Sequence, residues 1–175
     1  RRQRQMCIRD SYMICVIIYT IHYYIGGASD MKIVEKKMNL FDTPNRFMLA
    51  HCVSADFTLD AGIAKEFERR YHIKSRLDGS KTEVPACMSL VLEDKRIIHN
   101  IVTKKRYFEK PTYMTLNGGI EFLKQNLDVF DPECLLPLAI PKIGCGLDKL
   151  EWDKVRIILE ENFKDTDRNI LVCYL

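Results

Sequence analysis

The chain has 175 residues and a mass of 20.5 kDa, the size of a single domain with a full hydrophobic core. Hydrophobic residues at 47% and charged residues at 29% exclude a disordered or collagen-like chain. The net charge of +3 is too small to indicate a polyanionic partner or a membrane surface. Seven cysteines without a C-x-x-C pair, and four histidines without ligand-like spacing, predict reduced thiols, no metal site and a cytoplasmic protein.

Residues 1–30 differ from the rest of the chain because a basic start precedes an apolar run. That run, at 12–25, is shorter than the ~20 residues of a membrane-spanning helix. The small residues at 26–29 (GGAS) that follow it imitate the cleavage site of a signal peptide. We interpret 1–30 as a leader that is non-native or dispensable, ahead of a domain at 31–175. A signal peptide and an added edge strand are the alternatives.

From Met31 onward, strand-like and helix-like segments alternate. The hydrophobic patterns first predict strands at 32–38 and 46–53, followed by a helix with Ile63, Phe67 and Tyr71 inward. Strands at 88–92 and 96–103 come next, and then a helix whose inward residues are Leu116, Ile120, Leu123 and Leu127. The last elements are a strand at 135–140, a helix over 151–163 with Val155, Ile158, Leu159 and Phe163 inward, and a strand at 170–174. Asp60 is placed to cap the first helix, and Gly79 lies in the loop after it. The alternation predicts an α/β fold with helices on both faces of the sheet.

Ligands of α/β proteins bind beyond the carboxyl ends of the strands, so the strand-to-helix loops are the first places to examine. The loop at 141–148 (PKIGCGLD) carries Gly144 and Gly146, which let the backbone turn sharply and present N–H groups to an anion. The positive end of the following helix adds to this effect. A phosphate cradle and a simple tight turn are both consistent with the pattern. Asp148 and Glu151 also fit a capping box at the third helix.

The loop at 54–64 opens the first helix with small residues. Ala61 and Gly62 allow a ligand to approach the backbone closely, and they suit close packing of the helix on the sheet equally well. His51 and Cys52 precede this loop on a strand predicted to be buried, where core packing is the default role for each.

A third feature is the basic cluster of Lys104, Lys105 and Arg106 at the end of a predicted strand. Such a cluster is usually a solvated strand end. The functional alternative is that crowding by two cations makes Lys104 lose its proton more easily, which would make it a nucleophile toward an aldehyde carbon.

Taken together, these loops resemble the macro domain family, and within it the terminal ADP-ribose protein glycohydrolases, also described as O-acetyl-ADP-ribose deacetylases. The segments that carry the resemblance are AHCVS (50–54), AGIA (61–64), IVTKKR (101–106), KPTY (110–113) and PKIGCGLDKLEW (141–152). The resemblance implies a three-layer α/β/α sandwich with a mixed central sheet. It also implies a cleft for ADP-ribose at the strand ends.

By the same resemblance, Lys104 and Asp148 are catalytic. Lys104 would attack the anomeric carbon of the distal ribose and release a glutamate side chain, leaving a lysyl-ADP-ribose adduct that Asp148 resolves as general base. The loop Gly144-Cys145-Gly146 would hold the diphosphate through backbone N–H groups, with no metal and no cofactor.

The resemblance places further contacts with ADP-ribose along the same loops. Leu40 and Ser54 would line the adenosine end, 142–148 the diphosphate and distal ribose, and Leu175 the cleft edge. The complete expected set is Asn39, Leu40, His51, Ser54, Ala61, Gly62, Ile63, Pro141, Lys142, Ile143, Gly144, Cys145, Gly146, Leu147, Asp148 and Leu175. Asn39 stands where many macro domains have an aspartate, and its amide can accept from the adenine amino group without charge assistance.

The sequence therefore predicts a hydrolase that removes ADP-ribose from acidic side chains or from O-acetyl-ADP-ribose. A hydrolase of ADP-ribosylated DNA bases, as in related antitoxin macro domains, and a non-catalytic reader of ADP-ribose are the alternatives. The presence of both Lys104 and Asp148 argues against the reader. The expected partners are ADP-ribose and ADP-ribosylated proteins, with ADP-ribosylated DNA as the alternative and no membrane. The expected state is a monomer.

Overall fold

The computed structural model describes residues 33–78 and 82–175, so the predicted leader at 1–30 and the loop position Gly79 lie outside the described residues. The strands are β1 (Ile33–Lys37), β2 (Met48–Ser54), β3 (Ala86–Val91), β4 (Ile97–Lys104), β5 (Leu138–Pro141) and β6 (Ile170–Tyr174). The helices are the 3-10 turn η1 (Leu40–Asp42) and the α-helices α2 (Gly62–Tyr71), α3 (Lys74–Leu77), α4 (Tyr113–Phe130) and α5 (Trp152–Phe163).

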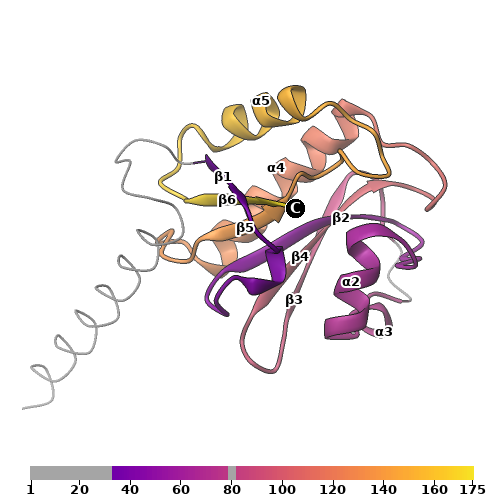
Figure 1. Ribbon diagram of the computed structural model, residues 1–175, viewed down its shortest axis with the longest axis horizontal. Coiled ribbons are helices and arrows are strands. Elements are labelled where there is room, and N and C mark those ends of the chain that lie inside the picture. Colours follow the sequence, from indigo (N-terminus) through magenta and orange to yellow (C-terminus); the bar gives the residue numbers. More distant parts are fainter. Residues whose placement is uncertain (1–32, 79–81) are drawn as a thin grey trace, which may run out of the picture.

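The strands form one six-stranded sheet in the order β1-β6-β5-β2-β4-β3 (Figure 1). Every neighbouring pair is parallel except β3 and β4, which are antiparallel. Helices α4 and α5 cover one face of the sheet, and α2 and α3 cover the other. This arrangement confirms the predicted three-layer α/β/α sandwich with a mixed central sheet.

The apolar periodicity of the helices matches their burial. The four residues predicted to face inward on α4 are fully buried, namely Leu116, Ile120, Leu123 and Leu127. Strand β4 lies in the interior between the two helical layers, and each of its residues is buried until Lys104, which ends the strand half-buried. Because β2, β4 and β5 are neighbours and run in the same direction, Ser54, Lys104 and Pro141 end at the same edge of the sheet.

The strand predicted at 135–140 begins only at Leu138. The backbone N–H groups of Leu135 and Leu136 donate to the carboxylate of Asp131, so they are not available to a neighbouring strand. The short helices η1 and α3 were not predicted, because three or four residues are too few to show a helical period. Within the described ranges, no helix is both long enough and apolar enough to cross a bilayer.

A buried arginine joins the end of α4 to the start of β6. Arg168 is 1% exposed, and its guanidinium pairs with the carboxylate of Asp131 at 2.6 Å. The same guanidinium donates to the backbone carbonyls of Asp131 at 2.7 Å and Leu136 at 3.1 Å. The surrounding protein therefore replaces most of the hydration that this cation loses on folding.

Replacement of Arg168 by methionine is expected to lower the free energy of unfolding by about 3–5 kcal/mol, because it leaves a buried carboxylate and several carbonyls without their cation. Urea denaturation followed by circular dichroism measures this effect. Arg69→Met is the matched control. The ion pair between Arg69 and Glu66 is exposed, so we expect no detectable change in the free energy of unfolding when it is lost. Equal effects of the two substitutions would contradict this account of Arg168.

Two histidines are fully buried on opposite faces of the sheet. His51 stacks on the ring of Phe67 at 3.8 Å and its Nε2 lies 2.9 Å from the amide oxygen of Asn100, while His99 binds the Ser89 hydroxyl through Nδ1 at 2.7 Å. Burial lowers the pKa of His51 to about 4, against a smaller opposing effect of its hydrogen bond. Burial and, to a lesser degree, the charge of Arg168 lower the pKa of His99 to about 3.

Both histidines are therefore neutral in the folded protein at a pH at which they would be protonated in the unfolded chain. Because the pKa is lowered on folding, stability is full above about pH 6.5 and falls as the pH drops from there toward 4, by up to about 1.4 kcal/mol per pH unit for each histidine. Urea titrations between pH 7.5 and 5 measure this slope, in a window where most carboxylates stay ionised. His72→Asn is the control for the loss of an exposed histidine. A free energy of unfolding that stays constant across this window would contradict the prediction.

Candidate active site

A cavity of about 690 Å³ opens at the edge of the sheet where β2, β4 and β5 end. Its volume falls in the range of small-molecule and cofactor sites. The lining residues are Cys52, Val53, Ser54, Thr58, Leu59, Asp60, Ala61, Gly62, Ile63, Ala64, Lys104, Tyr107, Lys110, Pro141, Lys142, Ile143, Gly144, Gly146, Leu147 and Asp148. The three loops singled out in the sequence thus meet around one cavity.

Lys104 and Asp148 form an ion pair in this cavity. The Lys104 Nζ lies 2.5 Å from Asp148 Oδ1, and each side chain is 13% exposed. The two predicted catalytic residues are in direct contact although they are 44 positions apart in sequence. Lys104 ends β4 at the point where the register between β2 and β4 shifts, at Val53 and Ser54.

The structure corrects two expectations about this pair. The nearest charge to Lys104 is the carboxylate of Asp148, whereas Lys105 and Arg106, which were expected to crowd it, are exposed. Asp148 does not cap α5 either. Glu151 occupies the cap position without a side-chain bond, and its backbone N–H donates to the hydroxyl of Tyr113. The D-x-x-E pattern gives the right spacing for a capping box, but the carboxylate is engaged with the lysine.

The glycine-rich loop turns tightly at the cavity wall. Gly144 has a φ of +72°, and a Cβ there would lie 2.9 Å from a side-chain carbon of Leu150. Only glycine suits this position without strain. The N–H of Cys145 donates to the carbonyl of Lys142, so this group stabilises the turn and is not offered to a ligand. Of the expected Gly144-Cys145-Gly146 cradle, only the two glycines line the cavity.

The helix end at the cavity belongs to α2 and not to α5, which corrects the expectation for the glycine-rich loop. The first turn of α2, from Ala61 to Ala64, lines the cavity, while the first residues of α5 do not. Ala61 is the cap residue of α2 and no side chain caps the helix, so the predicted cap by Asp60 is wrong. Uncapped N–H groups at a helix start attract anions, which makes this turn a suitable place for a diphosphate.

Lys142 lines the cavity, but its ammonium is bound elsewhere. It pairs with the carboxylate of Glu35 at 3.0 Å and lies 4.6 Å from the ring centre of Tyr174. Burial by itself raises the pKa of Glu35. Hydrogen bonds from Trp152 and Lys142 and the positive charges of Lys142 and Arg156 outweigh this effect, so that the pKa lies below its usual value. Glu35 is therefore an ionised anchor, and the ammonium of Lys142 is already paired where Lys142 lines the cavity.

Five of the residues expected to contact ADP-ribose do not line the cavity: Asn39, Leu40, His51, Cys145 and Leu175. The Asn39 amide oxygen accepts from the N–H of Phe41 at 3.1 Å and caps η1. Leu40 and His51 are buried in the core, Cys145 is half-buried and Leu175 is 90% exposed. Contacts of these residues with ADP-ribose stay predictions.

The segment 110–113 (KPTY) holds the loop that carries Asp148. The Lys110 ammonium donates to the backbone carbonyl of Leu147, and the Tyr113 hydroxyl accepts from the backbone N–H of Glu151. Lys110 and Tyr107 were missing from the expected site residues, although 110–113 was among the segments of the family resemblance. The sequence signal for Tyr107 is its place three residues after Lys104, in the loop that leaves β4.

Cys52, which lines the cavity, and Cys145, which lies in the glycine-rich loop without lining it, are poor nucleophiles. Burial and the nearby charge of Asp148 raise the pKa of the Cys52 thiol, and burial raises that of Cys145 to about 11. Both remain protonated at neutral pH and are therefore unreactive. In the parts of the chain that the structure describes, no three His, Cys, Asp or Glu side chains are grouped so that they could hold a metal ion.

Comparisons with known proteins place these features in context. No family model matches the sequence. The chain is 36% identical over 146 residues to the human protein named ADP-ribose glycohydrolase OARD1, in an alignment that covers 81% of this chain and 90% of that protein. The protein of the same name from Bos taurus is also 36% identical over 146 residues, with the same coverage.

Among solved structures, the macrodomain of Mycobacterium tuberculosis DarG superposes with a TM-score of 0.73 at 19% identity, covering 82% of this chain and 97% of that chain. Thermosipho africanus DarTG in complex with ADP-ribose superposes with a TM-score of 0.68 at 16% identity, covering 82% of this chain and 42% of that chain. At these identities the superpositions establish a shared fold.

Proposed function

The chain belongs to the macro domain family of ADP-ribose glycohydrolases, and on that premise we propose that it removes ADP-ribose from glutamate side chains of proteins or from O-acetyl-ADP-ribose. One observation carries the proposal: the ion pair between Lys104 and Asp148, with a spacing of 2.5 Å inside the cavity. A binding module that only recognised ADP-ribose would not need a buried amine next to a carboxylate. A predicted cytoplasmic location and monomeric state stay predictions.

The ion pair supplies the proton transfer that the reaction needs. An ammonium has no lone pair, so Lys104 must lose a proton before it can attack, and the carboxylate of Asp148 is close enough to accept it. The neutral amine then forms an Nζ–C1 bond to the distal ribose while the bond from C1 to the acyl oxygen breaks. The leaving carboxylate takes the proton that Asp148 accepted, so the glutamate or acetate is released as a free carboxyl group and Asp148 is again ionised. The ADP-ribose remains covalently attached to the lysine.

Hydrolysis of the adduct restores the enzyme. Asp148 accepts a proton from water, the resulting hydroxide adds to C1, and the amine of Lys104 leaves and is reprotonated. The net reaction consumes one water and releases ADP-ribose and the free carboxyl group. No redox partner is needed.

The remaining cavity walls suit ADP-ribose. The uncapped first turn of α2 and the glycine-rich loop both line the cavity and meet at one point, where a Cβ on Gly62 would lie 3.3 Å from a side-chain carbon of Leu147. Backbone N–H groups on both sides can bind a diphosphate without a lysine or a metal. This leaves Lys104 and Asp148 for the distal ribose.

The proposed function is tested with a panel of purified substrates that carry ADP-ribose on glutamate, serine, thymidine or guanine, together with O-acetyl-ADP-ribose. Release of free ADP-ribose is the measurement. We expect turnover of the glutamate ester and of O-acetyl-ADP-ribose, both of which have a carboxylate leaving group. Turnover confined to a nucleobase would instead favour the alternative of a DNA-directed hydrolase, and binding of ADP-ribose without turnover would favour the reader.

A further inference from the structure

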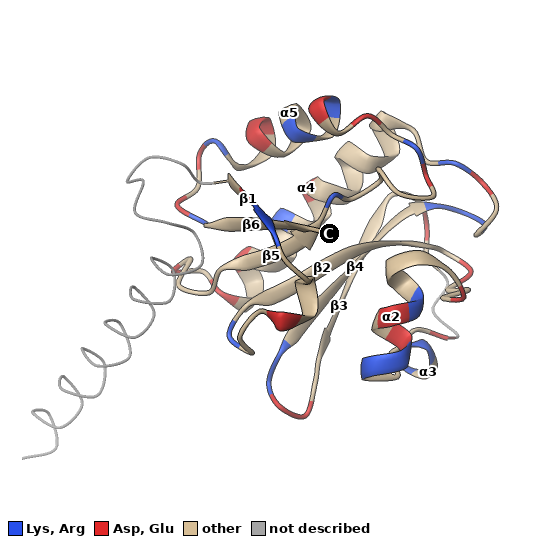
Figure 2. Cartoon of the chain, viewed as in Figure 1, with Lys and Arg blue, Asp and Glu red and all other residues tan. Residues whose placement is uncertain are grey.

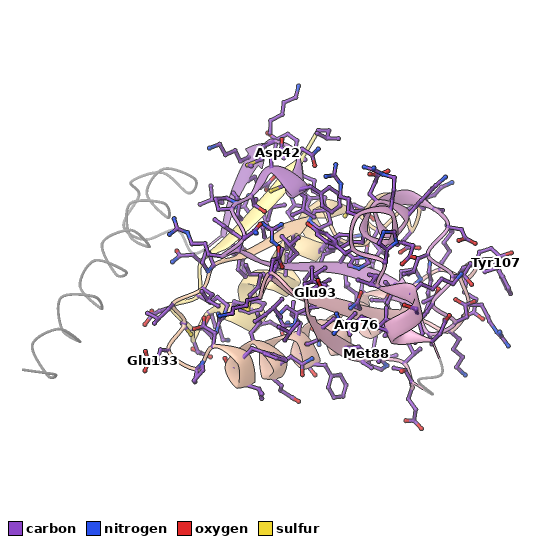
Figure 3. All side chains as sticks on the ribbon, turned by 90° about the horizontal axis from the view of Figure 1, so that it is seen from below. Asp42, Arg76, Met88, Glu93, Tyr107 and Glu133 are labelled. Atoms are coloured by element: carbon purple, nitrogen blue, oxygen red, sulfur yellow. The ribbon has the colours of Figure 1, made fainter. Side chains whose placement is uncertain are left out.

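The loop that leaves β4 presents two exposed aromatic side chains beside the candidate active site. Tyr107 is 59% exposed and Phe108 is 68% exposed, and their rings are in edge contact with centres 5.3 Å apart. Tyr107 also lines the cavity, three residues after Lys104. Figure 3 shows Tyr107 at an outer edge of the molecule, at the end opposite Glu133. Exposed aromatic residues that adjoin a cavity indicate a contact surface for something larger than the cavity holds.

The backbone of this loop is fixed by two carboxylates. Asp56 accepts from the N–H of Tyr107 at 3.0 Å, and Glu109 accepts from the N–H groups of Lys105 and Arg106 at 3.1 and 3.2 Å. Burial raises the pKa of Asp56, but its hydrogen bonds from Ser54, Tyr107 and Thr58 outweigh burial and lower it. Asp56 is therefore an ionised anchor, and the aromatic pair is presented by an ordered loop.

The same loop is rich in exposed cations. Lys105, Arg106 and Lys110 are all exposed, and Lys110 also donates to the carbonyl of Leu147. The two nearby carboxylates, Asp56 and Glu109, accept from backbone N–H groups. Elsewhere acidic and basic residues are intermixed, as Figure 2 shows for α5 and α2. The surface around Tyr107 and Phe108 thus combines apolar area with a local excess of positive charge.

We propose that Tyr107 and Phe108, with Lys105, Arg106 and Lys110, form the subsite for the leaving group: an acidic stretch of polypeptide on either side of the ADP-ribosylated glutamate. This inference rests on the proposed function. ADP-ribose occupies the cavity up to Lys104, so the group expelled from the distal ribose must pass the loop that directly follows Lys104. The aromatic rings contact the side chains next to the modified glutamate, and the cations pair with their carboxylates.

A strand of nucleic acid is the less suitable occupant. It carries a phosphate at every residue and is bound by basic residues that follow its backbone over several nucleotides. Here the three cations are confined to residues 105–110, within reach of only a short charged segment. An acidic peptide needs no more than that.

The test compares two leaving groups of different size. Values of kcat/KM are measured for an ADP-ribosyl-glutamyl peptide with Asp and Glu neighbours and for O-acetyl-ADP-ribose, whose acetate is too small to reach the loop. For Tyr107→Ala and Phe108→Ala we expect the ratio of peptide to acetyl kcat/KM to fall about tenfold. The backbone bond of Tyr107 to Asp56 does not depend on its side chain, so the loop keeps its anchor. Phe122→Ala on α4 is the matched control, because this exposed phenylalanine lies outside the cavity lining and should leave the ratio unchanged.

Charge is tested separately with Lys105→Glu. This variant should turn over the acidic peptide more slowly and the same peptide with Lys neighbours faster, while Lys124→Glu on α4 should affect the two peptides equally.

An unchanged ratio of peptide to acetyl turnover in both aromatic variants would overturn the proposal, as would a loss confined to an ADP-ribosylated single-stranded oligonucleotide. If the wild type released ADP-ribose from neither the peptide nor O-acetyl-ADP-ribose, the proposed function itself would be wrong, and the subsite would be wrong with it.

Discussion

Replacing Lys104 with alanine is expected to lower the release of ADP-ribose from a glutamyl substrate by about 10³-fold or more, while binding of ADP-ribose changes little. We expect this because Lys104 and the two binding segments would contact different parts of ADP-ribose. In the proposed function the lysine contacts only the distal ribose, whereas the first turn of α2 and the glycine-rich loop supply most of the cavity wall. Steady-state release of ADP-ribose measures the first quantity, and isothermal titration calorimetry measures the second.

Lys105→Ala is the matched control for this substitution. Lys105 is the same residue type one position further along the chain, but it is exposed and lies outside the cavity lining. The two variants are compared on O-acetyl-ADP-ribose, whose acetate does not reach Lys105: Lys105→Ala should stay within about twofold of the wild type, whereas Lys104→Ala should lose turnover as it does on the glutamyl substrate. If Lys104→Ala hydrolysed the glutamyl substrate at the wild-type rate, a nucleophilic role for this lysine would be untenable.

Replacing Asp148 with alanine is expected to stop the reaction after one turnover per protein molecule. Without this carboxylate, the adduct on Lys104 lacks its general base, and we expect the steady-state rate to fall by about 10²–10⁴-fold. The first step also slows, because the same carboxylate accepts the proton of Lys104. A slow burst of glutamate release, equal to the enzyme concentration and followed by a stalled reaction, is the expected time course.

Asp153→Ala controls for the loss of an acidic side chain near α5. Asp153 lies in the first turn of α5, outside the cavity lining. Its carboxylate is better placed than that of Asp148 to interact favourably with the positive end of this helix. We expect a small loss of stability and no change in turnover. If Asp148→Ala likewise affected only stability, Asp148 would have a purely structural role.

The sequence was most informative where local patterns decide the structure. The alternating four- and three-residue spacing on α4 places Leu116, Ile120, Leu123 and Leu127 in the core, as expected from helical geometry alone. The last strand was predicted with the bounds that β6 has. The helix is long enough for its period to show, and the strand is a short, continuous apolar run.

Local patterns failed where a distant residue competes for the same group. The spacing of Asp148 and Glu151 fits a helix cap, but Lys104, which lies 44 positions earlier, binds the carboxylate instead. The ammonium of Lys142 likewise pairs with Glu35, more than 100 positions earlier, a partner that no local pattern indicates. Such contacts depend on which strands become neighbours, and spacing along the chain does not contain that information.

The proposed mechanism requires that Lys104 forms a covalent bond to ADP-ribose and that Asp148 promotes the hydrolysis of this bond. Mass spectrometry of Asp148→Ala tests this after incubation with an ADP-ribosyl-glutamyl peptide, first on the intact protein and then on its proteolytic fragments. We expect a mass increase of one ADP-ribose, located on Lys104 and absent from the double variant with Lys104→Ala. An unmodified protein, or an adduct on any other residue, would contradict this mechanism.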